Sequence, residues 1–237
     1  MDKERKVNKR KNVLKMLLSV LILIIIFLII YEVSIWYDGN LDSSNPMSRE
    51  EVVRLLEKGK EYGNYYYYPE TKGFFSDNNK TEYYIKDNIE VIYLNSEIIS
   101  WVDYNIRERI MILNGKTAVV ATNINENLTN AVNQHGFDYS LIVGKEPYNY
   151  EYKYLGEKTQ NGRKLIVVSV WNEEYKMLPT KFVIDKETGL IFERSDYVNI
   201  AFIPIKITFD RNIKLDAITD EDVKRPDLNN YELFGNK

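Results

Sequence analysis

Histidine and cysteine most often carry nucleophilic or metal-dependent chemistry, and this chain is poor in both. Its 237 residues include one histidine and no cysteine. Thiol nucleophiles, Cys-based zinc sites, disulfides and a lipidated N-terminal cysteine are therefore excluded. The single histidine, His135, lies in the polar, turn-like stretch NQHG at 133–136, with no nucleophilic serine motif nearby. We interpret His135 as a loop residue, because a catalytic triad needs positioned partners.

Carboxylates near the C-terminus are the next candidates for chemistry. They are Asp216, Asp220, Glu221, Asp222 and Asp227. Calcium binding needs oxygen ligands on one compact loop, and the EF-hand order with its central glycine and distal glutamate is absent. We therefore expect a helix-start cap and a solvated face here, with weak Ca²⁺ binding as the alternative.

Motifs for the common reaction classes are absent from the sequence. There is no Gly-x-Ser-x-Gly, P-loop, dinucleotide fingerprint or zinc-protease motif. Glycoside hydrolysis would need two carboxylates across a cleft, and the sequence does not pair any two of its many acids. We predict that the chain is not an enzyme, uses no cofactor and no metal, and has no catalytic residue.

Tyrosine is the most unusual component, with 19 residues against 9 Phe and 3 Trp. The clearest pattern is at Tyr148, Tyr150, Tyr152 and Tyr154, which alternate with polar residues. In a strand this spacing places four rings on one sheet face. Such a face either lines an apolar ligand pocket or packs on a helix, and for any single tyrosine we favour packing.

The N-terminal region separates charge from hydrophobicity. Residues 1–15 have a net charge of +5, and the rest of the chain has a net charge of -8. Residues 16–37 begin with 15 uncharged, mostly aliphatic residues and end in Trp36-Tyr37. The 24 positions from Val13 to Trp36 can cross a hydrocarbon core of about 30 Å as a helix.

Three interpretations compete for this hydrophobic segment. No small-residue cleavage site follows it, which disfavours a removed signal peptide. A buried core helix would not be apolar on all sides beside a basic tail. We predict a signal anchor at 16–37 in the cell membrane, with 1–15 cytoplasmic and the C-terminal part extracytoplasmic. The basic tail then sets the topology, and we expect no nucleic-acid partner.

The exported part is expected to open with a helix. Turn-forming residues make a linker at 38–47, and the domain is predicted at 48–237. Ser48 and Glu51 have the spacing of a capping box. Apolar residues then recur at helical intervals, which predicts an amphipathic helix over 49–60.

The hydrophobic period changes to two from Asn64 on. Strands are predicted at 64–68, 81–86, 89–94, 98–104, 107–113, 117–122, 148–154, 164–171, 180–185, 190–197 and 205–210, with one short helix in the polar gap 123–147. Asn-Gly pairs at 114–115 and 161–162 predict hairpins. The fold class is α+β: a transmembrane helix, then an amphipathic helix packed on a curved antiparallel sheet of about ten strands, an incomplete β-barrel.

Several longer stretches resemble a known family. They are SREEVVRLLEKGKEYGNYYY from Ser48, YKYLGEKTQNGRKLIVVSV from Tyr152, FVIDKETGLIFERSDY from Phe182 and ITDEDVKRPDLNNYEL from Ile218. Over about Ser48 to Leu233 the chain resembles the LolA-like superfamily of exported half-barrel proteins. That superfamily includes periplasmic lipoprotein carriers, RseB-like envelope-stress sensors and small anchored Clostridium-type proteins. The resemblance implies a half-barrel whose concave face, covered by helices, holds acyl chains.

Two functions remain open from the sequence. One is a membrane-anchored binding or sensing module for acyl chains or lipoprotein segments. The other is an interaction or regulatory module of the cell envelope, with a filled core and another envelope protein as partner. A cavity between helix 49–60 and the sheet would favour the first. The residues to examine there are Leu55, Leu56, Tyr66, Tyr84, Tyr150, Tyr152, Phe182 and Phe209.

Overall fold

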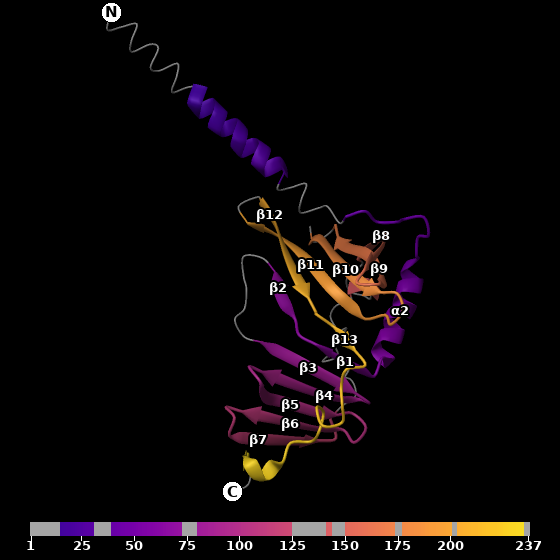
Figure 1. Ribbon diagram of the computed structural model, residues 1–237, viewed down its shortest axis with the longest axis vertical. Coiled ribbons are helices and arrows are strands. Elements are labelled where there is room, and N and C mark those ends of the chain that lie inside the picture. Colours follow the sequence, from indigo (N-terminus) through magenta and orange to yellow (C-terminus); the bar gives the residue numbers. More distant parts are fainter. Residues whose placement is uncertain are drawn as a thin grey trace, which may run out of the picture. The chain divides into compact units, whose positions relative to one another are not determined.

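The structure of the protein is a computed structural model (Figure 1). It describes residues 15–30, 39–72, 80–124, 141–143, 150–173, 177–200 and 203–234. His135 and most of the expected short helix at 123–147 lie outside these residues. The chain forms two compact units: one comprises residues 1–40 and 199–205, and the other comprises Leu41–Val198 with Lys206–Lys237.

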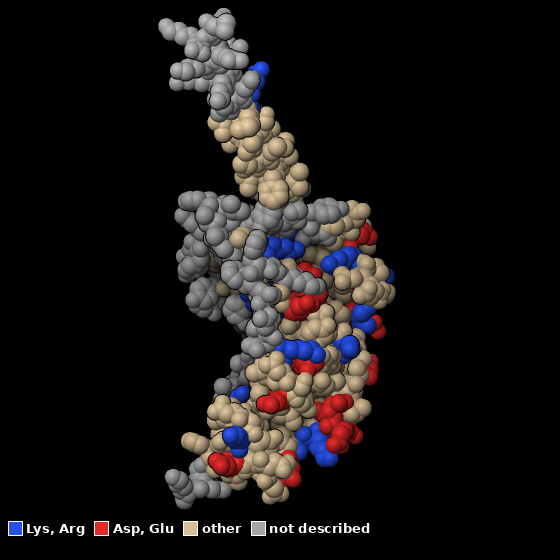
Figure 2. Space-filling model, turned by 60° about the vertical axis from the view of Figure 1, so that its left-hand side comes forward, with Lys and Arg blue, Asp and Glu red and all other residues tan. Residues whose placement is uncertain are grey.

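The first unit contains an α-helix at residues 15–30. Its large apolar side chains are all between 40% and 68% exposed, and Figure 2 shows no charge on its surface except at one end. Within the described part of the chain, no helix meets the length and hydropathy needed to cross a membrane. The predicted anchor at 16–37 continues past the described helix, so the anchor stays a prediction.

Helix α2 (Arg49–Glu61) opens the second unit as expected. The backbone N–H of Glu51 donates to Ser48 Oγ at 3.3 Å, and that of Ser48 donates to Glu51 Oε2 at 2.7 Å. These two bonds satisfy amide donors that a helix start otherwise leaves unpaired, which confirms the capping box. Val52 and Leu56 are completely buried on its apolar side.

Fourteen strands lie in the described residues, in two groups. The eight-stranded group runs in the order β13 (Lys214–Leu215), β1 (Asn64–Tyr67), β3 (Thr81–Lys86), β4 (Ile89–Leu94), β5 (Glu97–Asp103), β6 (Glu108–Leu113), β7 (Thr117–Thr122) and β14 (Glu232–Leu233). The six-stranded group runs β2 (Glu70–Lys72), β12 (Ile203–Asp210), β11 (Ile191–Ile200), β10 (Met177–Asp185), β9 (Arg163–Asn172) and β8 (Glu151–Gln160). The short pairing of β14 with β7 is parallel.

The pairing of β1 with β13 in one group continues without a shift into the pairing of β2 with β12 in the other. Tyr65 of β1 lies opposite Leu215 of β13, and Glu70 of β2 lies opposite Asp210 of β12. Both strands advance by five residues between these pairs, so no residue is inserted on either side. The groups are therefore halves of one sheet. They are joined by a long two-stranded ribbon, in which β1 continues into β2 and β12 continues into β13.

The ribbon is interrupted where its backbone cannot continue the ladder. Pro69 lacks the amide hydrogen that a ladder needs. Asn212 has a left-handed φ of 42°, and its side-chain amide donates to the carbonyl of Tyr68 at 3.4 Å. Joining β1 to β2 and β12 to β13 gives eleven antiparallel strands and the short β14. The predicted single curved sheet of about ten strands is thus close to the observed sheet (Figure 1).

The six-stranded half is apolar on both faces, as the sequence of its central strand β9 predicted. On the inner face, which carries α2, Val52 and Leu56 form one buried cluster with Phe182 and residues of β9. On the outer face, Leu165 and Val167 pack with Leu41. This half therefore has a core on each side.

Two glycines seat α2 on the six-stranded half. A Cβ on Gly59 would collide with the backbone of Gly189, and a Cβ on Gly189 would collide with the backbone of Leu55. Gly189 also has a φ of 79° in the turn between β10 and β11. The helix can approach this turn only because neither position carries a side chain.

The eight-stranded half has its larger buried cluster on the outer face. Tyr66, Val91 and Trp101 pack there against Ile218 and Val223 of the C-terminal segment, residues 216–234. The indole Nε1 of Trp101 donates to the carbonyl of Val223 at 2.9 Å. The C-terminal segment thus does for this half what α2 does for the other, but on the opposite face.

The acidic residues near the C-terminus have structural contacts. Asp222 Oδ2 accepts from the amide of Thr219 at 2.8 Å, and Asp227 caps the 3₁₀ helix η1 (Leu228–Asn230). Asp216 accepts from the hydroxyl of Tyr62 at about 3 Å. In the described ranges no group of three or more His, Cys, Asp or Glu side chains could hold a metal ion. The capping prediction is confirmed.

Candidate functional site

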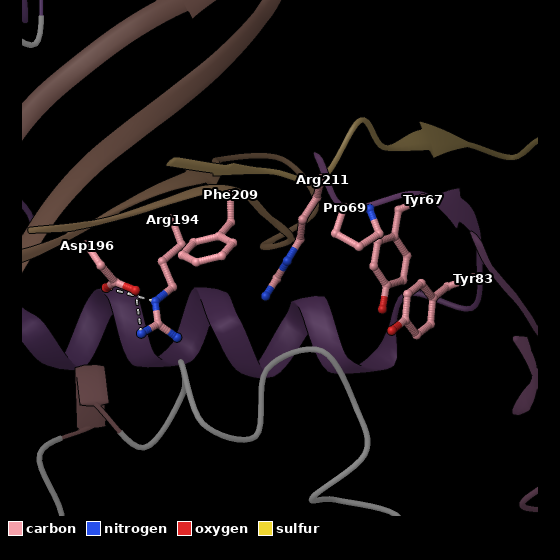
Figure 3. A pocket seen from close by; sticks show the side chains of 7 residues that line it. All are labelled: Tyr67, Pro69, Tyr83, Arg194, Asp196, Phe209 and Arg211. Atoms are coloured by element: carbon pink, nitrogen blue, oxygen red, sulfur yellow. Dashed lines mark hydrogen bonds and ion pairs between the residues drawn. The ribbon is translucent and has the colours of Figure 1, made fainter. Parts of the chain in front are cut away.

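A pocket lies where the two halves of the sheet meet, on the inner face. Its volume is about 290 Å³, close to the lower end of the range for small-molecule sites. Figure 3 shows the seven side chains that line it. They are Tyr67, Pro69, Tyr83, Arg194, Asp196, Phe209 and Arg211.

Register explains why these side chains share one face. Phe182 faces α2, and Arg194 lies directly opposite it on β11. Tyr67 lies directly opposite Tyr83 in the same way. Residues directly opposite one another in antiparallel strands project to the same side of the sheet. The kinked ribbon supplies the remaining residues, so the pocket exists because the two halves join there.

Aromatic rings form one wall of the pocket. The rings of Tyr67 and Tyr83 stack with centroids 4.3 Å apart and planes at 10° (Figure 3). Burial raises the pKa of both phenols above the ordinary tyrosine value, so both stay neutral at physiological pH. Phe209 lies beside Arg194, whose guanidinium carbon is 5.9 Å from the ring centroid. This wall offers apolar surface with polar edges.

Charged groups form the other side of the pocket. Arg194 Nε donates to Asp196 Oδ1 at 3.0 Å, and Arg194 Nη2 is 2.8 Å from Asp196 Oδ2. Arg211 donates to the carbonyl of Ile191 at 3.4 Å. Two guanidinium groups and one carboxylate give the lining a formal charge of +1. The pocket therefore combines apolar walls with a weakly positive rim.

A second group of side chains lies on the inner face of β4, β5 and β6 and at Tyr104, the residue that follows β5. We call it the polar band: Glu90, Ser100, Tyr104 and Arg109. Glu90 is 3% exposed and Ser100 is 4% exposed. Glu90 Oε1, Ser100 Oγ, the Tyr104 hydroxyl and Arg109 Nε are buried with no hydrogen-bond partner among the described residues. Each such atom costs about 1–3 kcal/mol of stability, so four in one band require an explanation.

The polar band adjoins the pocket through the ladder. Tyr83 lies opposite Ile92, which lies opposite Ser100. Two strand spacings separate Tyr83 from Ser100, or about 10 Å. Glu90 and Arg211 also act on the same phenols, since the negative charge of Glu90 raises the pKa of Tyr67 and the positive charge of Arg211 lowers it. The band therefore lies on the same face as the pocket, although none of its residues lines the pocket.

Glu90 is the most perturbed acid of this surface. Burial raises its pKa to about 7, and the positive charge of Arg109 opposes that shift. Glu82, one strand away on the outer face, behaves differently. Burial would raise its pKa too, but hydrogen bonds from Lys80 and Tyr66 outweigh burial and hold it below the ordinary value. The same residue type is thus satisfied on one face and unsatisfied on the other.

The residues that the sequence pointed to are spread over three places. Phe209 alone lines the pocket. Leu56 and Phe182 are buried beneath α2, with Leu55, Tyr150 and Tyr152 packed against them. Tyr66 and Tyr84 lie on the outer face under the C-terminal segment. The contact between α2 and the sheet is a packed core at these residues.

The sequence did not predict most of the pocket residues, because it does not show which face of the sheet each of them occupies. Residues 65–68 are four consecutive tyrosines, so period-two alternation cannot tell inner from outer rings. The structure places Tyr65 and Tyr67 on the inner face and Tyr66 and Tyr68 on the outer. The ladder pairs β1 residue by residue with β3, and only that pairing assigns Tyr83 to the pocket.

Comparisons with known proteins found similarity in structure alone. No family model and no curated protein matches the sequence. An uncharacterized conserved protein from Thermus thermophilus matches with a TM-score of 0.45 and 9% identity, over 79% of this chain and 98% of that one. MucB matches with a TM-score of 0.45 and 13% identity, over 77% and 65%. A LolA superfamily protein from Nitrosomonas europaea matches with a TM-score of 0.27 and 11% identity, over 73% and 96%.

The superfamily that the sequence resembles is thus among these neighbours. At these identities and TM-scores the likeness carries no information about ligand or partner.

Proposed function

We propose that the protein is a binding or sensing module whose ligand site is the inner-face pocket at the junction of the two sheet halves. The observation that carries the proposal is the pocket itself: about 290 Å³, with a stacked tyrosine wall and two arginines. Apolar walls with a few polar groups are typical of small-molecule sites. The ligand is an acyl chain, free or as part of a lipoprotein segment.

The module is tethered to the cell membrane by residues 16–37, with its domain outside the cytoplasm. The helix at 15–30 supports this proposal because its apolar side chains are exposed on all sides and only Lys15 is charged. The net charge of +5 on residues 1–15 supports a cytoplasmic N-terminus. Protease added to intact cells should remove the domain, and a domain that stays intact would contradict the topology.

The alternative is an interaction module of the cell envelope with another protein as partner. The packed interface of α2 with the sheet favours it, since Leu56 and Phe182 are completely buried there. Crosslinking from the domain would then capture one specific envelope protein, and the pocket would stay empty. The two functions are separable because they place the contact at different surfaces.

Ligand binding is tested with the full-length protein in lipid nanodiscs and a fluorescent fatty acid. Tyr83→Leu removes half of the stacked wall and should weaken binding by about tenfold, a loss typical of one aromatic contact. Tyr84→Leu is the matched control, because it changes the next residue of β3 on the outer face. Equal losses in the two variants, or no binding to the wild type, would contradict the proposal.

A further inference from the structure

The positive charge of the pocket is centred on Arg211. Among the seven lining side chains Asp196 is the one carboxylate, and its Oδ2 is 2.8 Å from Nη2 of Arg194. These two opposite charges balance, so the formal charge of +1 on the lining is that of Arg211. The charged members of the polar band, Glu90 and Arg109, also carry opposite formal charges and leave this sum unchanged.

Two hydrogen bonds to β11 hold Arg211 in place. Its backbone amide donates to the carbonyl of Phe192 at 2.9 Å, and its guanidinium donates to the carbonyl of Ile191 at 3.4 Å. Carbonyls carry no net charge, so these bonds fix the side chain without cancelling its charge. A side chain that is ordered before the ligand arrives lowers the entropy cost of binding.

Apolar surface flanks Arg211 on both sides. Figure 3 shows the ring of Phe209 on one side and the stacked rings of Tyr67 and Tyr83 on the other. The two phenol hydroxyls point to the same side as the guanidinium (Figure 3). Burial raises the pKa of both phenols, so they carry no negative charge that would oppose an anion. A chain can therefore lie along the rings while its end group meets Arg211.

The chemistry of Arg211 ranks the possible end groups. An ammonium group would be repelled by the guanidinium. A neutral group would leave the charge of the lining unbalanced. A carboxylate or phosphate balances it and presents oxygens that match the planar fork of a guanidinium. Such charge-assisted hydrogen bonds are about twice as strong as neutral ones.

We propose that the pocket selects amphiphiles with an anionic end group, which Arg211 binds while the apolar chain lies against Phe209 or the stacked tyrosines. This inference rests on the proposed binding function and narrows it to chains that end in an oxyanion. An acyl group joined to a protein through a neutral linkage would be a weaker ligand. Carboxylate and phosphate share the required chemistry, and the probes below separate them.

The test uses the full-length protein in phosphatidylcholine nanodiscs at neutral pH, titrated calorimetrically against empty nanodiscs. The probes are octanoate, octyl phosphate, octanamide and octylammonium, which carry different end groups on chains of similar length. One of the two anions should bind at least about tenfold more tightly than the amide, and the ammonium should bind most weakly. The tighter anion identifies carboxylate or phosphate as the end group.

Arg211→Gln locates the anion. It should weaken binding of the preferred anion by about tenfold, whereas octanamide should bind as it does to the wild type. Arg225→Gln is the matched control, because it removes the same charge from a residue that pairs with Glu108 at 2.8 Å and does not line the pocket. Urea denaturation confirms that both variants are folded.

Asp196→Asn should have the opposite effect on binding. It removes the carboxylate that balances Arg194, so the formal charge of the lining rises from +1 to +2. The preferred anion should then bind about threefold more tightly or better. A gain in affinity cannot result from a damaged fold, so this variant separates charge from stability.

The outcomes distinguish this inference from the function on which it rests. Octanamide or octylammonium binding as tightly as the anions, equal losses in Arg211→Gln and Arg225→Gln, or no gain in Asp196→Asn would overturn the selection of an anion. The pocket would then still be a binding site. Binding of none of the four probes would overturn the proposed binding function as well.

Discussion

The two halves of the sheet bury their main apolar clusters on opposite faces. The six-stranded half has a closed apolar core beneath α2, where Val52, Leu56 and Phe182 are completely buried. The eight-stranded half packs its larger apolar cluster outward against the C-terminal segment, and beside Tyr65 and Tyr67 it leaves Glu90 and Ser100 buried but unpaired on its inner face. One half therefore resembles a scaffold, and the other keeps polar groups where they lower stability.

Unpaired polar groups distinguish the two halves more than their apolar clusters do. Residues that cost stability persist when something other than folding needs them. The cluster around α2 has one such atom, the Tyr154 hydroxyl, whereas the polar band has four. The contrast predicts that substitutions beneath α2 lower stability and that removing a charge from the band raises it.

The largest effect is expected where α2 contacts the turn between β10 and β11. Gly189→Ala should lower the free energy of unfolding by more than about 3 kcal/mol, because the new Cβ collides with backbone and the φ is left-handed. Gly162→Ala is the control: its φ is also positive, at 77°, but a Cβ there meets nothing within 4 Å. Urea denaturation of both measures the collision alone. Equal losses of stability in the two variants would show that α2 does not pack closely against Gly189.

Glu90→Gln tests the polar half and should have the opposite sign. The folded pKa of Glu90 is about 7 and its ordinary value is 4.5, so between these values the unfolded chain loses a proton that the folded chain keeps. Stability therefore falls as pH rises through this window, by up to about 3 kcal/mol. The variant should be more stable than the wild type at pH 8 and similar at pH 4.5.

Glu82→Gln provides the matched comparison on the outer face. Its folded pKa is lowered, so its stabilisation is present above the unfolded pKa and is lost as pH falls through the folded one. The variant should be less stable than the wild type at pH 7, and the difference should shrink as the pH falls below 4.5. Urea denaturation across pH measures both variants, and pH profiles of the same sign would contradict the difference between the faces.

Trp101→Phe should loosen the C-terminal segment by a smaller amount. It removes the indole N–H that donates to Val223 and leaves space in a buried cluster. We expect a loss of about 1–3 kcal/mol and faster proteolysis within residues 216–234. Cleavage there at the wild-type rate would show that the hydrogen bond does not hold the segment.

The smallest effect is expected at the surface pair of Lys224 and Glu221. The two groups are 2.9 Å apart, but their side chains are 66% and 79% exposed. Lys224→Gln should change the free energy of unfolding by less than about 0.5 kcal/mol in 0.15 M salt. A loss as large as that of Trp101→Phe would mean that charge pairs, rather than packing, hold the C-terminal segment.

Local patterns in the sequence predicted the elements well. The capping box at Ser48 and Glu51 and the Asn-Gly turn at 161–162 are present as expected. The strand at 164–171 was predicted to be central and apolar on both faces, and β9 is. These features depend on neighbours within a few residues, so the sequence alone specifies them.

The candidate site escaped the same reasoning. Tyr66 and Tyr67 are adjacent and identical in type, yet one packs under the C-terminal segment and the other lines the pocket. Glu90 and Glu82 differ in the sequence only by position, yet their pKa values shift in opposite directions. Both differences depend on which face of the sheet each residue occupies and on what covers that face.

The charge asymmetry, the helix, the strands and their antiparallel order follow from the sequence alone, because propensity, capping and period-two patterning act locally. The tertiary structure decided that two groups of strands share one ladder through a kink at Pro69 and Asn212. It also decided that Arg194, Phe209 and Tyr83 meet in one pocket. Strand pairing sets these contacts between residues more than a hundred positions apart, and no local pattern encodes them.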